Sequence, residues 1–493
     1  MLFNSQIFIC LFLPVTLIVY FVLSTFRLNT LSKGWLLATS LLFYGYWSLL
    51  HLYLLIGSVL INFLIGSAIA KIKHHRSQAK LLLVIGITIN LLLIAYYKYA
   101  DFFIQSVNSL SQGSLDLLNI ALPLAISFYT FTQIAYLVDV YREDIPVYNL
   151  LDYSLFVTFF PQLIAGPILR HDEMIPELGR QEKFSERSFA LGMSLFTLGL
   201  AKKMLIADRL SPWVAEVFTH ADAVSFVEAW FGALSYTLQL YFDFSGYSDM
   251  AVGLGWLFNI NLPINFNSPY KAVSIADFWR RWHITLSNFL RDYLYIPLGG
   301  NRKGALRQQG NLVLTMLLGG LWHGAGWTFV LWGGLHGLYL AINHQWRKSG
   351  IKLPGWLGWL LTFMAVVLGW VLFRASSLTE GVVLLKTLMG GNGVVLPGNL
   401  APILSWLSPL GIDFVGTSAS TALPHLSGTS SQQLATNLGT IVMLLAGVVW
   451  LPNAKTIVEK YLPSPIAAAV LGLLLTYCLF MMSQPSEFLY FQF

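Results

Sequence analysis

Histidine is the residue type in this chain best suited to acid–base chemistry, because its ordinary pKa lies near physiological pH. His323 lies in the apolar, glycine-rich segment GGLWHGAGWTFVLWGGLHGLYL. An ionisable side chain at membrane depth indicates a functional site, and the surrounding glycines allow an extended ligand to approach the ring closely. A packed histidine that bonds a backbone carbonyl is the structural alternative. His336, one helix further on, fits that structural role better.

A second histidine, His283, lies in the basic, aromatic segment DFWRRWHITLSNFLRDYLYIPLGGNRKG. Its imidazole could position a substrate or the first histidine, and an interfacial histidine that snorkels is the alternative. Arg280, Arg281 and Arg291 lie close to it in the sequence. These cations could hold the phosphates of a cytoplasmic nucleotide-bearing donor, whereas ordinary cytoplasmic anchoring is their structural explanation.

Other kinds of site find little support in the sequence. The two cysteines, Cys10 and Cys478, lie near opposite ends of the chain, so we expect neither a disulfide framework nor a metal site. Asp243 and Asp249 could bind an ion at the end of a span, but helix capping is the simpler role. The sequence contains no P-loop, GxSxG or HExxH motif. We expect no metal and no permanently bound cofactor.

The elements that position these residues are transmembrane helices. Of the 493 residues, 56% are hydrophobic and only 11% are charged, against about a quarter charged in soluble domains. Apolar runs recur along the chain and are long enough to cross a hydrocarbon core of about 30 Å. The net charge of the chain is +6. In a membrane protein such an excess usually reflects lysines and arginines in cytoplasmic loops, and it does not indicate nucleic-acid binding. We predict an all-α polytopic membrane protein with a single membrane domain over residues 1–493.

Hydropathy predicts about eleven or twelve crossings. The expected spans lie near 1–26, 51–70, 81–97, 118–139, 188–206, 227–246, 311–343 (as two helices), 355–373, 438–452 and 463–482. The stretch 153–168 is apolar but broken by prolines and a glycine, which predicts a re-entrant or interfacial element enclosed by protein. The basic segment 271–310 predicts interfacial helices, and the connection 374–437 predicts an external loop with little regular structure.

Basic loops set the expected orientation. Segments 27–33, 71–80 and 271–310 carry the clustered lysines and arginines. The positive-inside rule places them in the cytoplasm. Both termini are then expected to face out.

Several ordered motifs resemble the membrane-bound O-acyltransferase family, specifically its polysaccharide-acetylating branch typified by alginate O-acetyltransferase. The resemblance runs nearly end to end, with its core region at about 118–375. The family's membrane histidine falls on His323 and its second motif residue on His283. Ala125 stands where the common pattern has glycine. The motifs are LPLAISFYTFTQIAYLVDVYR at 122–142, FFPQLIAGPILR at 159–170, YFDFSGYSDMAVG at 241–253, the DFWRRWHITL segment at 277–304, LWHGAGWTFVLWGGLHGLYL at 321–340 and GWVLFRA at 369–375.

The resemblance implies a ring of helices around a central tunnel, in a multi-pass protein of the bacterial inner membrane. It implies that an acetyl group passes from a cytoplasmic donor, with acetyl-coenzyme A the leading candidate, to an exported polysaccharide such as alginate. It also implies an extracytoplasmic acetyltransferase or acyl-acceptor protein as partner. A neutral imidazole suits removal of a proton from an acceptor hydroxyl, so His323 is predicted as general base and His283 as the residue that orients donor or acceptor.

Three other functions remain open from the sequence. Within the same enzyme class, the chain could transfer D-alanine toward teichoic acid, or acylate a lipid or lipid-linked sugar directly. From another class, it could be a proton-coupled transporter. A proton relay predicts polar groups along successive spans, whereas here they concentrate around 277–344, which favours an enzyme with one site.

Overall fold

The computed structural model is predominantly helical and describes residues 1–142, 145, 148–179, 183–415, 423–426, 431–461, 464–482 and 489. The chain forms two compact units. Unit 1 contains residues 1–201, 246–265 and 454–493, and unit 2 contains residues 202–245 and 266–453. Helix α12 (Phe226–Leu257) contributes residues to both. The single membrane domain over residues 1–493 stays a prediction.

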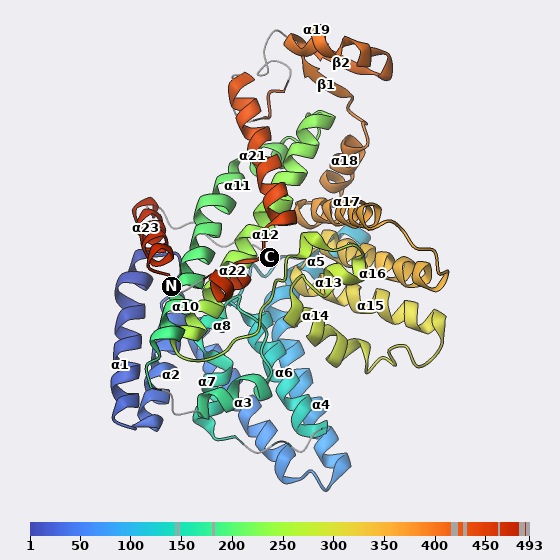
Figure 1. The fold of residues 1–493 in the computed structure, drawn as a ribbon. Helices are drawn as coiled ribbons and strands as arrows, with labels where there is room; N and C mark the ends of the chain where they lie inside the picture. Colours follow the sequence, from blue (N-terminus) through green and yellow to red (C-terminus); the bar gives the residue numbers. More distant parts are fainter. Residues whose placement is uncertain are drawn as a thin grey trace. The chain divides into compact units, whose positions relative to one another are not determined.

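Unit 1 begins with two helices, α1 and α2, that lie side by side (Figure 1). Aromatic side chains of η1, which leads into α1, contact α2: the Phe8 and Phe12 rings each lie 5.8 Å from the Phe43 ring, centroid to centroid. The other described helices of this unit follow in chain order. The elements of unit 1 are η1 (Phe8–Phe12), α1 (Leu13–Thr25), α2 (Asn29–Gly45), α3 (Leu49–Lys71), α4 (Arg76–Ile94), η2 (Ala95–Tyr99), α5 (Ala100–Ser111), α6 (Ile126–Arg142), α7 (Leu150–Thr158), α8 (Phe160–Leu163), α9 (His171–Gly179), α10 (Glu186–Ala201), α22 (Ala454–Tyr461) and α23 (Pro465–Met481).

Helices α3 and α4 are joined by a pair of buried amides. Asn62 and Asn90 donate to each other's side-chain oxygens at 3.2 and 2.6 Å. Because lipid offers no hydrogen-bond partners, such polar pairs stabilise contacts between apolar helices. Gly66 and Gly86 let α6 approach both helices, since a Cβ at either position would lie 2.6 or 2.7 Å from an α6 side chain.

The segment predicted to be re-entrant is broken and buried, as expected. Helix α7 ends before Phe159, whose φ of −52° and ψ of 111° are not helical, and the short α8 follows directly. Gln162 donates its amide to the carbonyl of Phe156 across the break. Such a break is tolerated at membrane depth because protein encloses it and supplies partners for its polar groups.

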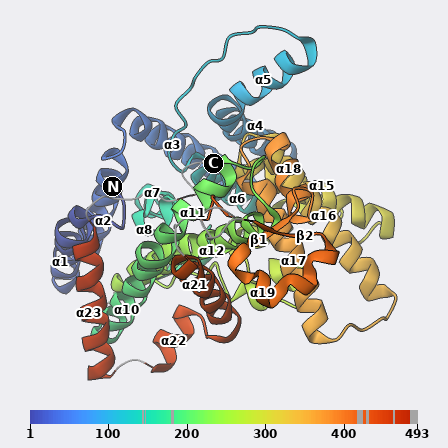
Figure 2. The same ribbon diagram turned by 90° about the horizontal axis from the view of Figure 1, so that it is seen from above.

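The glycines of YFDFSGYSDMAVG allow α10 and the unit 1 part of α12 to touch through their backbones. A Cβ at Gly192 of α10 would lie 2.7 Å from the carbonyl oxygen of Gly253, and one at Gly199 would lie 2.5 Å from that of Gly246. Small residues at this spacing permit the close helix approach that is common in membranes. On the other side, α10 contacts α23 (Figure 2).

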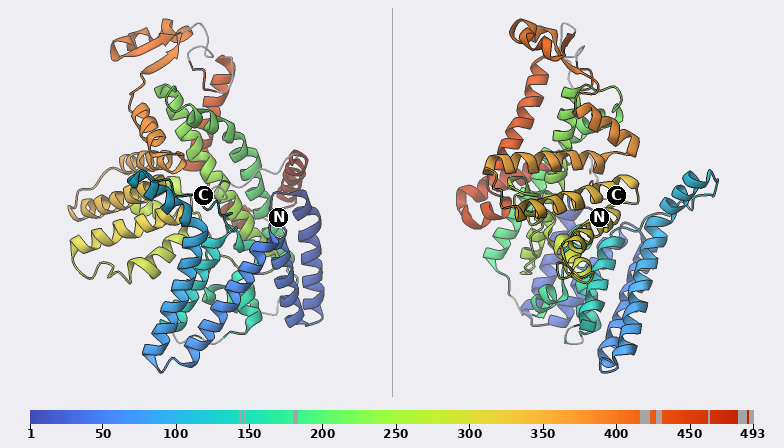
Figure 3. Two further views of the ribbon diagram at one scale, coloured as in Figure 1. Left: turned by 180° about the vertical axis from the view of Figure 1, so that it is seen from behind. Right: turned by 90° about the vertical axis from the view of Figure 1, so that its right-hand side faces the viewer.

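Unit 2 is built around α15, α16 and α17, which stack one beside the next (Figure 3). Short helices over 269–295 lead into this stack, and their place at the membrane interface stays a prediction. The elements of unit 2, besides α12, are η3 (Lys202–Ala207), α11 (Asp208–Thr219), η4 (Pro269–Lys271), α13 (Ile275–Trp279), α14 (Ile284–Leu290), η5 (Arg291–Tyr295), α15 (Ala305–His323), α16 (Trp327–Lys348), α17 (Gly355–Arg374), α18 (Leu378–Leu388), β1 (Val394–Pro397), η6 (Gly398–Leu400), α19 (Ala401–Leu404), η7 (Ser405–Leu410), β2 (Ile412–Val415) and α21 (Ser431–Trp450).

The connection 374–437 contains more regular structure than the sequence suggested, so that prediction was wrong. Helix α18 occupies 378–388, and β1 pairs in parallel with β2, with Val394 opposite Ile412. Ser377 caps α18 by accepting from the backbone N–H of Glu380 at 3.1 Å. Serine followed three residues later by glutamate is the capping-box signature, and the polar composition of the connection concealed it.

Six helices in the described part of the chain are long and apolar enough to cross a membrane. The spans expected near 118–139, 227–246 and 311–343 are also helical, as α6, α12, α15 and α16. The prediction of an all-α polytopic membrane protein is therefore confirmed, while the number of crossings and the tunnel stay predictions. The six helices are Phe8–Thr25, Leu49–Lys71, Arg76–Ser111, Glu186–Thr219, Gly355–Arg374 and Gln433–Trp450.

Candidate active site

All five residues predicted for the site lie in unit 2. The contact of α15 with α16 positions His323. His323 is the last residue of α15. A Cβ at Gly320 would collide with the Phe329 carbonyl oxygen, and one at Gly333 would collide with that of Met316. The two backbones therefore touch, which only glycine permits. This contact fixes the position of the C-terminal end of α15, and with it the position of His323.

The His323 ring is enclosed by aromatic side chains and is only 5% exposed. Trp322, Trp332 and Phe373 lie 5.0, 5.1 and 5.3 Å away between ring centroids. The His283 ring lies at 6.4 Å. The structure thus brings together the two histidines that the sequence singled out, and their catalytic roles stay predictions.

His283 occupies an unusual backbone position at the start of α14. Its φ of 43° and ψ of 55° are left-handed, which costs a non-glycine residue about 1–3 kcal/mol. The ring is fully buried and lies 4.8 Å from the Phe244 ring. In this loop between α13 and α14, burial lowers the pKa of His283 to about 3, so the imidazole is neutral at physiological pH. A neutral ring held in a strained backbone is suited to positioning another group.

His336 is held differently from His323. It is fully buried, and its Nδ1 accepts a hydrogen bond from Trp279 Nε1 at 3.3 Å. Its Nε2 faces Gly369, where a Cβ would lie 2.9 Å away. The Trp332 ring contacts both histidines, at 4.9 Å from His336 and 5.1 Å from His323. This arrangement agrees with a structural role for His336.

The three arginines predicted to bind a donor have different environments. Arg280 is exposed. Arg281 donates to Asp277 at 3.0 Å and to the Asn267 carbonyl at 3.3 Å. Arg291 donates to both carboxylate oxygens of Asp292, at 2.7 and 3.0 Å, and its side chain is 57% exposed. Of these three, Arg291 lines a cavity.

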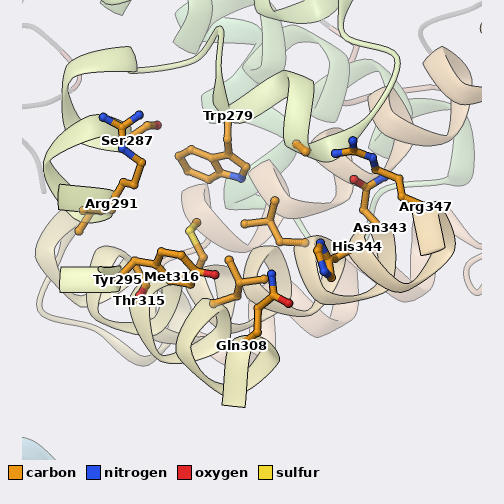
Figure 4. Close-up of a pocket in the computed structure, with 14 residues that line it drawn as sticks. Trp279, Ser287, Arg291, Tyr295, Gln308, Thr315, Met316, Asn343, His344 and Arg347 are labelled. Carbon is orange, nitrogen blue, oxygen red and sulfur yellow. The ribbon is translucent and has the colours of Figure 1, made fainter. Parts of the chain in front are cut away.

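That cavity has a volume of about 270 Å³ and lies among α13–α16 and η5 (Figure 4). Arg291 and Arg347 lie on opposite sides of the Trp279 indole. The same indole donates its N–H to His336, so one wall of the cavity contacts a buried histidine. The cavity is lined by Ala276, Trp279, Ser287, Leu290, Arg291, Tyr295, Gln308, Leu312, Thr315, Met316, Leu340, Asn343, His344 and Arg347.

Sequence reasoning missed the contribution of α16 to this cavity. Leu340, Asn343, His344 and Arg347 all line it. They are spaced as neighbours on one helix face, at i, i+3, i+4 and i+7. Three polar residues at this spacing in the last turns of an apolar helix were the signal that could have found them.

A buried ion cluster supports α12 beside His283. Lys203 is 3% exposed and its Nζ lies 2.6 Å from Asp243 and 2.7 Å from Asp208. Asp243 precedes Phe244, whose ring contacts His283. The capping role considered for Asp243 was wrong, because Asp243 lies in the interior of α12. Its carboxylate instead neutralises the buried Lys203, as buried charges require.

A known protein family matches most of this chain. The model of the membrane-bound O-acyltransferase family matches residues 39–378, a range that contains both histidines, all the predicted arginines and the cavity. The chain belongs to the membrane-bound O-acyltransferase family. It is thus an O-acyltransferase and a multi-pass membrane protein, and the resemblance noted from its motifs is confirmed.

The relatives differ in their acceptors. A peptidoglycan O-acetyltransferase of Helicobacter pylori is 46% identical over 432 residues, covering 80% of this chain and 81% of the relative. The probable alginate O-acetylase AlgI of Pseudomonas aeruginosa is 44% identical over 387 residues, covering 77% and 73%. A teichoic acid D-alanyltransferase of Bacillus subtilis is 27% identical over 280 residues, covering 51% and 69%.

Proposed function

We propose that this O-acyltransferase supplies acetyl groups from a cytoplasmic donor for O-acetylation of an exported polysaccharide. Two relatives above 40% identity over most of the chain carry the names of O-acetylating proteins, one for peptidoglycan and one for alginate. The D-alanyltransferase relative is less similar and covers about half of the chain. This difference supports acetyl transfer over D-alanyl transfer, and it supports a polysaccharide over a lipid as acceptor.

The proposed chemistry rests on the position of His323, which lies in an aromatic enclosure with the neutral His283 ring 6.4 Å away between centroids. A hydroxyl is a weak nucleophile until its proton is removed, and imidazole is the common base for that step. His323 takes the hydroxyl proton while the oxygen attacks the thioester carbonyl carbon. The C–O bond forms, the C–S bond breaks, and the departing sulfur receives the proton from the imidazolium. His283 orients the reacting group.

The donor is proposed to enter at the cavity between Arg291 and Arg347. Guanidinium groups bind phosphate oxygens through paired N–H donors, and a coenzyme A thioester carries several phosphates. Arg280 and Arg281 belong to the same basic segment and follow Trp279 of the cavity wall in the sequence, so we include them in the proposed donor site. Acetyl-coenzyme A is therefore the donor we propose. No cofactor is proposed to stay bound, since the donor is consumed in each turnover.

We propose that the acceptor and the partner lie on the extracytoplasmic side of the membrane. A polysaccharide hydroxyl receives the acetyl group there, directly or through an extracytoplasmic acetyltransferase or acyl-acceptor protein. Alginate is one candidate polymer. Peptidoglycan is the second, because the relative with that name is 46% identical over 80% of this chain.

Ester analysis of whole cells tests this function. Cells that carry the wild-type chain are compared with cells that carry His323→Ala, and acetyl esters are released from purified exopolysaccharide and from purified peptidoglycan. Acetyl esters that depend on His323 in either polymer support the proposal. D-alanyl esters, or acyl groups confined to extracted lipid, would contradict it.

A further inference from the structure

The turn at the corner between α11 and α12 brings Glu216 and His220 together with His425, a histidine from a distant part of the sequence. Glu216 and His220 lie one turn apart at the end of α11, and His425 comes from the described turn 423–426. The Nδ1 atoms of both histidines lie near the same carboxylate oxygen, Oε1 of Glu216, at 3.3 Å for His220 and 3.1 Å for His425. The Nδ1 atom of His220 also lies 2.9 Å from the backbone carbonyl oxygen of Glu216.

These distances match the coordination sphere of a small divalent metal ion. A tetrahedral Zn²⁺ with N and O ligands at about 2.0–2.1 Å holds neighbouring ligand atoms about 3.3 Å apart. The ligand atoms of the three residues all lie within 4.8 Å of one another. The two imidazole rings stack with centroids 4.5 Å apart, so both can face one ion from the same side.

The surroundings hold His425 in place independently of any metal. Its backbone N–H donates to Glu228 Oε1 at 2.8 Å, and Glu228 is itself buried and bonded to Ser225. Leu423 and Leu426, on either side of the histidine, are buried. The turn is therefore packed against this corner, and His425 lies beside Glu216 and His220 without a metal ion.

We propose that Glu216, His220 and His425 form a binding site for Zn²⁺ or a similar transition-metal ion. Two histidines and one glutamate are a ligand set that zinc accepts, with a fourth position left for water. Glu216 and His220 are 41% and 44% exposed in their side chains, which leaves room for that water. The ion fastens the turn 423–426 to the α11–α12 corner. The two halves of the site are 209 positions apart, so sequence spacing could not reveal it.

A zinc titration of the full-length protein in detergent tests the proposal. Metal is first removed with a chelator, and ZnCl2 is then added in competition with a chromophoric chelator. We expect one tight site per chain, weakened at least about tenfold in His220→Ala, His425→Ala and Glu216→Gln, because even outer-shell changes cost about 10- to 100-fold. The matched control is the double variant His74→Ala/His75→Ala, which removes an exposed histidine pair elsewhere.

Two further readouts keep the result independent of folding defects. Co²⁺ in the wild-type site should give the visible absorption of a four-coordinate ion, lost in His425→Gln. Zinc should raise the melting temperature of the wild type and not that of His425→Gln, since a ligand that binds the native state stabilises it. The absence of a stoichiometric site, a site unchanged in the three variants, or one lost only in the control would overturn the proposal.

Discussion

At the scale of single residues, His323 and His336 are similarly buried but differently held. His336 accepts a hydrogen bond from Trp279, whereas His323 ends its helix beside His283. The sequence could identify His323 from its glycine-rich apolar setting and could favour a structural role for His336. It could not show that Trp332 contacts both rings, because that depends on how α16 packs against α15.

The arginines around the cavity make a prediction at this scale. Arg291→Ala and Arg347→Ala should each raise the apparent KM for acetyl-coenzyme A about 10- to 100-fold, because a hydrogen bond to a charged group contributes about 1.5–3 kcal/mol. Initial rates at varied donor concentration measure this. Arg280→Ala and Arg281→Ala, compared in the same assay, show whether the whole basic segment contributes. An unchanged KM in all four variants would leave membrane anchoring as the better explanation of these charges.

At the scale of elements, close helix contacts position the site. Helices α15 and α16 touch through Gly320 and Gly333. The periodic apolar pattern predicted both helices but not their contact. The short helices over 269–295 were expected from interleaved charges and aromatic residues, yet the left-handed backbone of His283 was not predictable, since tertiary packing imposes it. Helix α18 was missed although its capping box was present in the sequence.

Separation of α15 from α16 should disable the enzyme. Gly333→Val places a side chain against the Met316 carbonyl, and such overpacking typically costs about 1–3 kcal/mol. We expect Gly333→Val to have a lower melting temperature than the wild type and to lose acetyl transfer, because His323 moves with the end of α15. Gly310→Ala is the matched control, since a Cβ there meets nothing within 4 Å. Equal activity in the two variants would show that the glycine contact does not position the site.

The ion cluster of η3 and α12 gives a second prediction for an element. Lys203→Met leaves Asp243 buried without its cation, and removal of one partner from a buried pair costs about 3–5 kcal/mol. Thermal unfolding in detergent should show a marked loss of stability. Lys202→Met, on the neighbouring and less buried lysine, should cost far less. If both variants unfolded alike, the cluster would not be a principal support of α12.

At the scale of the whole molecule, hydropathy alone indicates a polytopic helical membrane protein, because any span must satisfy its backbone hydrogen bonds internally. Of the two arginines that line the cavity, only Arg291 could be predicted from the sequence. Arg291 belongs to a conspicuous basic segment, whereas Arg347 comes from the end of an apolar helix. The proposed metal site at Glu216, His220 and His425 was not predictable, since His425 is remote in sequence from the other two residues.

Orientation in the membrane is the prediction at this scale. The basic loops should face the cytoplasm, so cysteines placed at Thr30, His75 and Ala305 should resist an impermeant thiol reagent in intact cells. A cysteine at Asp413, in β2, should react. The native cysteines, Cys10 and Cys478, are first replaced by serine. Reaction of any of the first three positions from outside would reverse or break the proposed topology.

Acyl transfer per folded molecule in His323→Ala measures the catalytic role of His323 directly. Loss of a general base typically lowers the rate by about 10²- to 10⁴-fold, while loss of a merely packed histidine lowers stability. We predict that His323→Ala elutes as a folded protein in size-exclusion chromatography and transfers almost no acetyl group. His336→Ala should lose stability but keep substantial turnover per folded molecule. Near-normal transfer by well-folded His323→Ala would contradict the account.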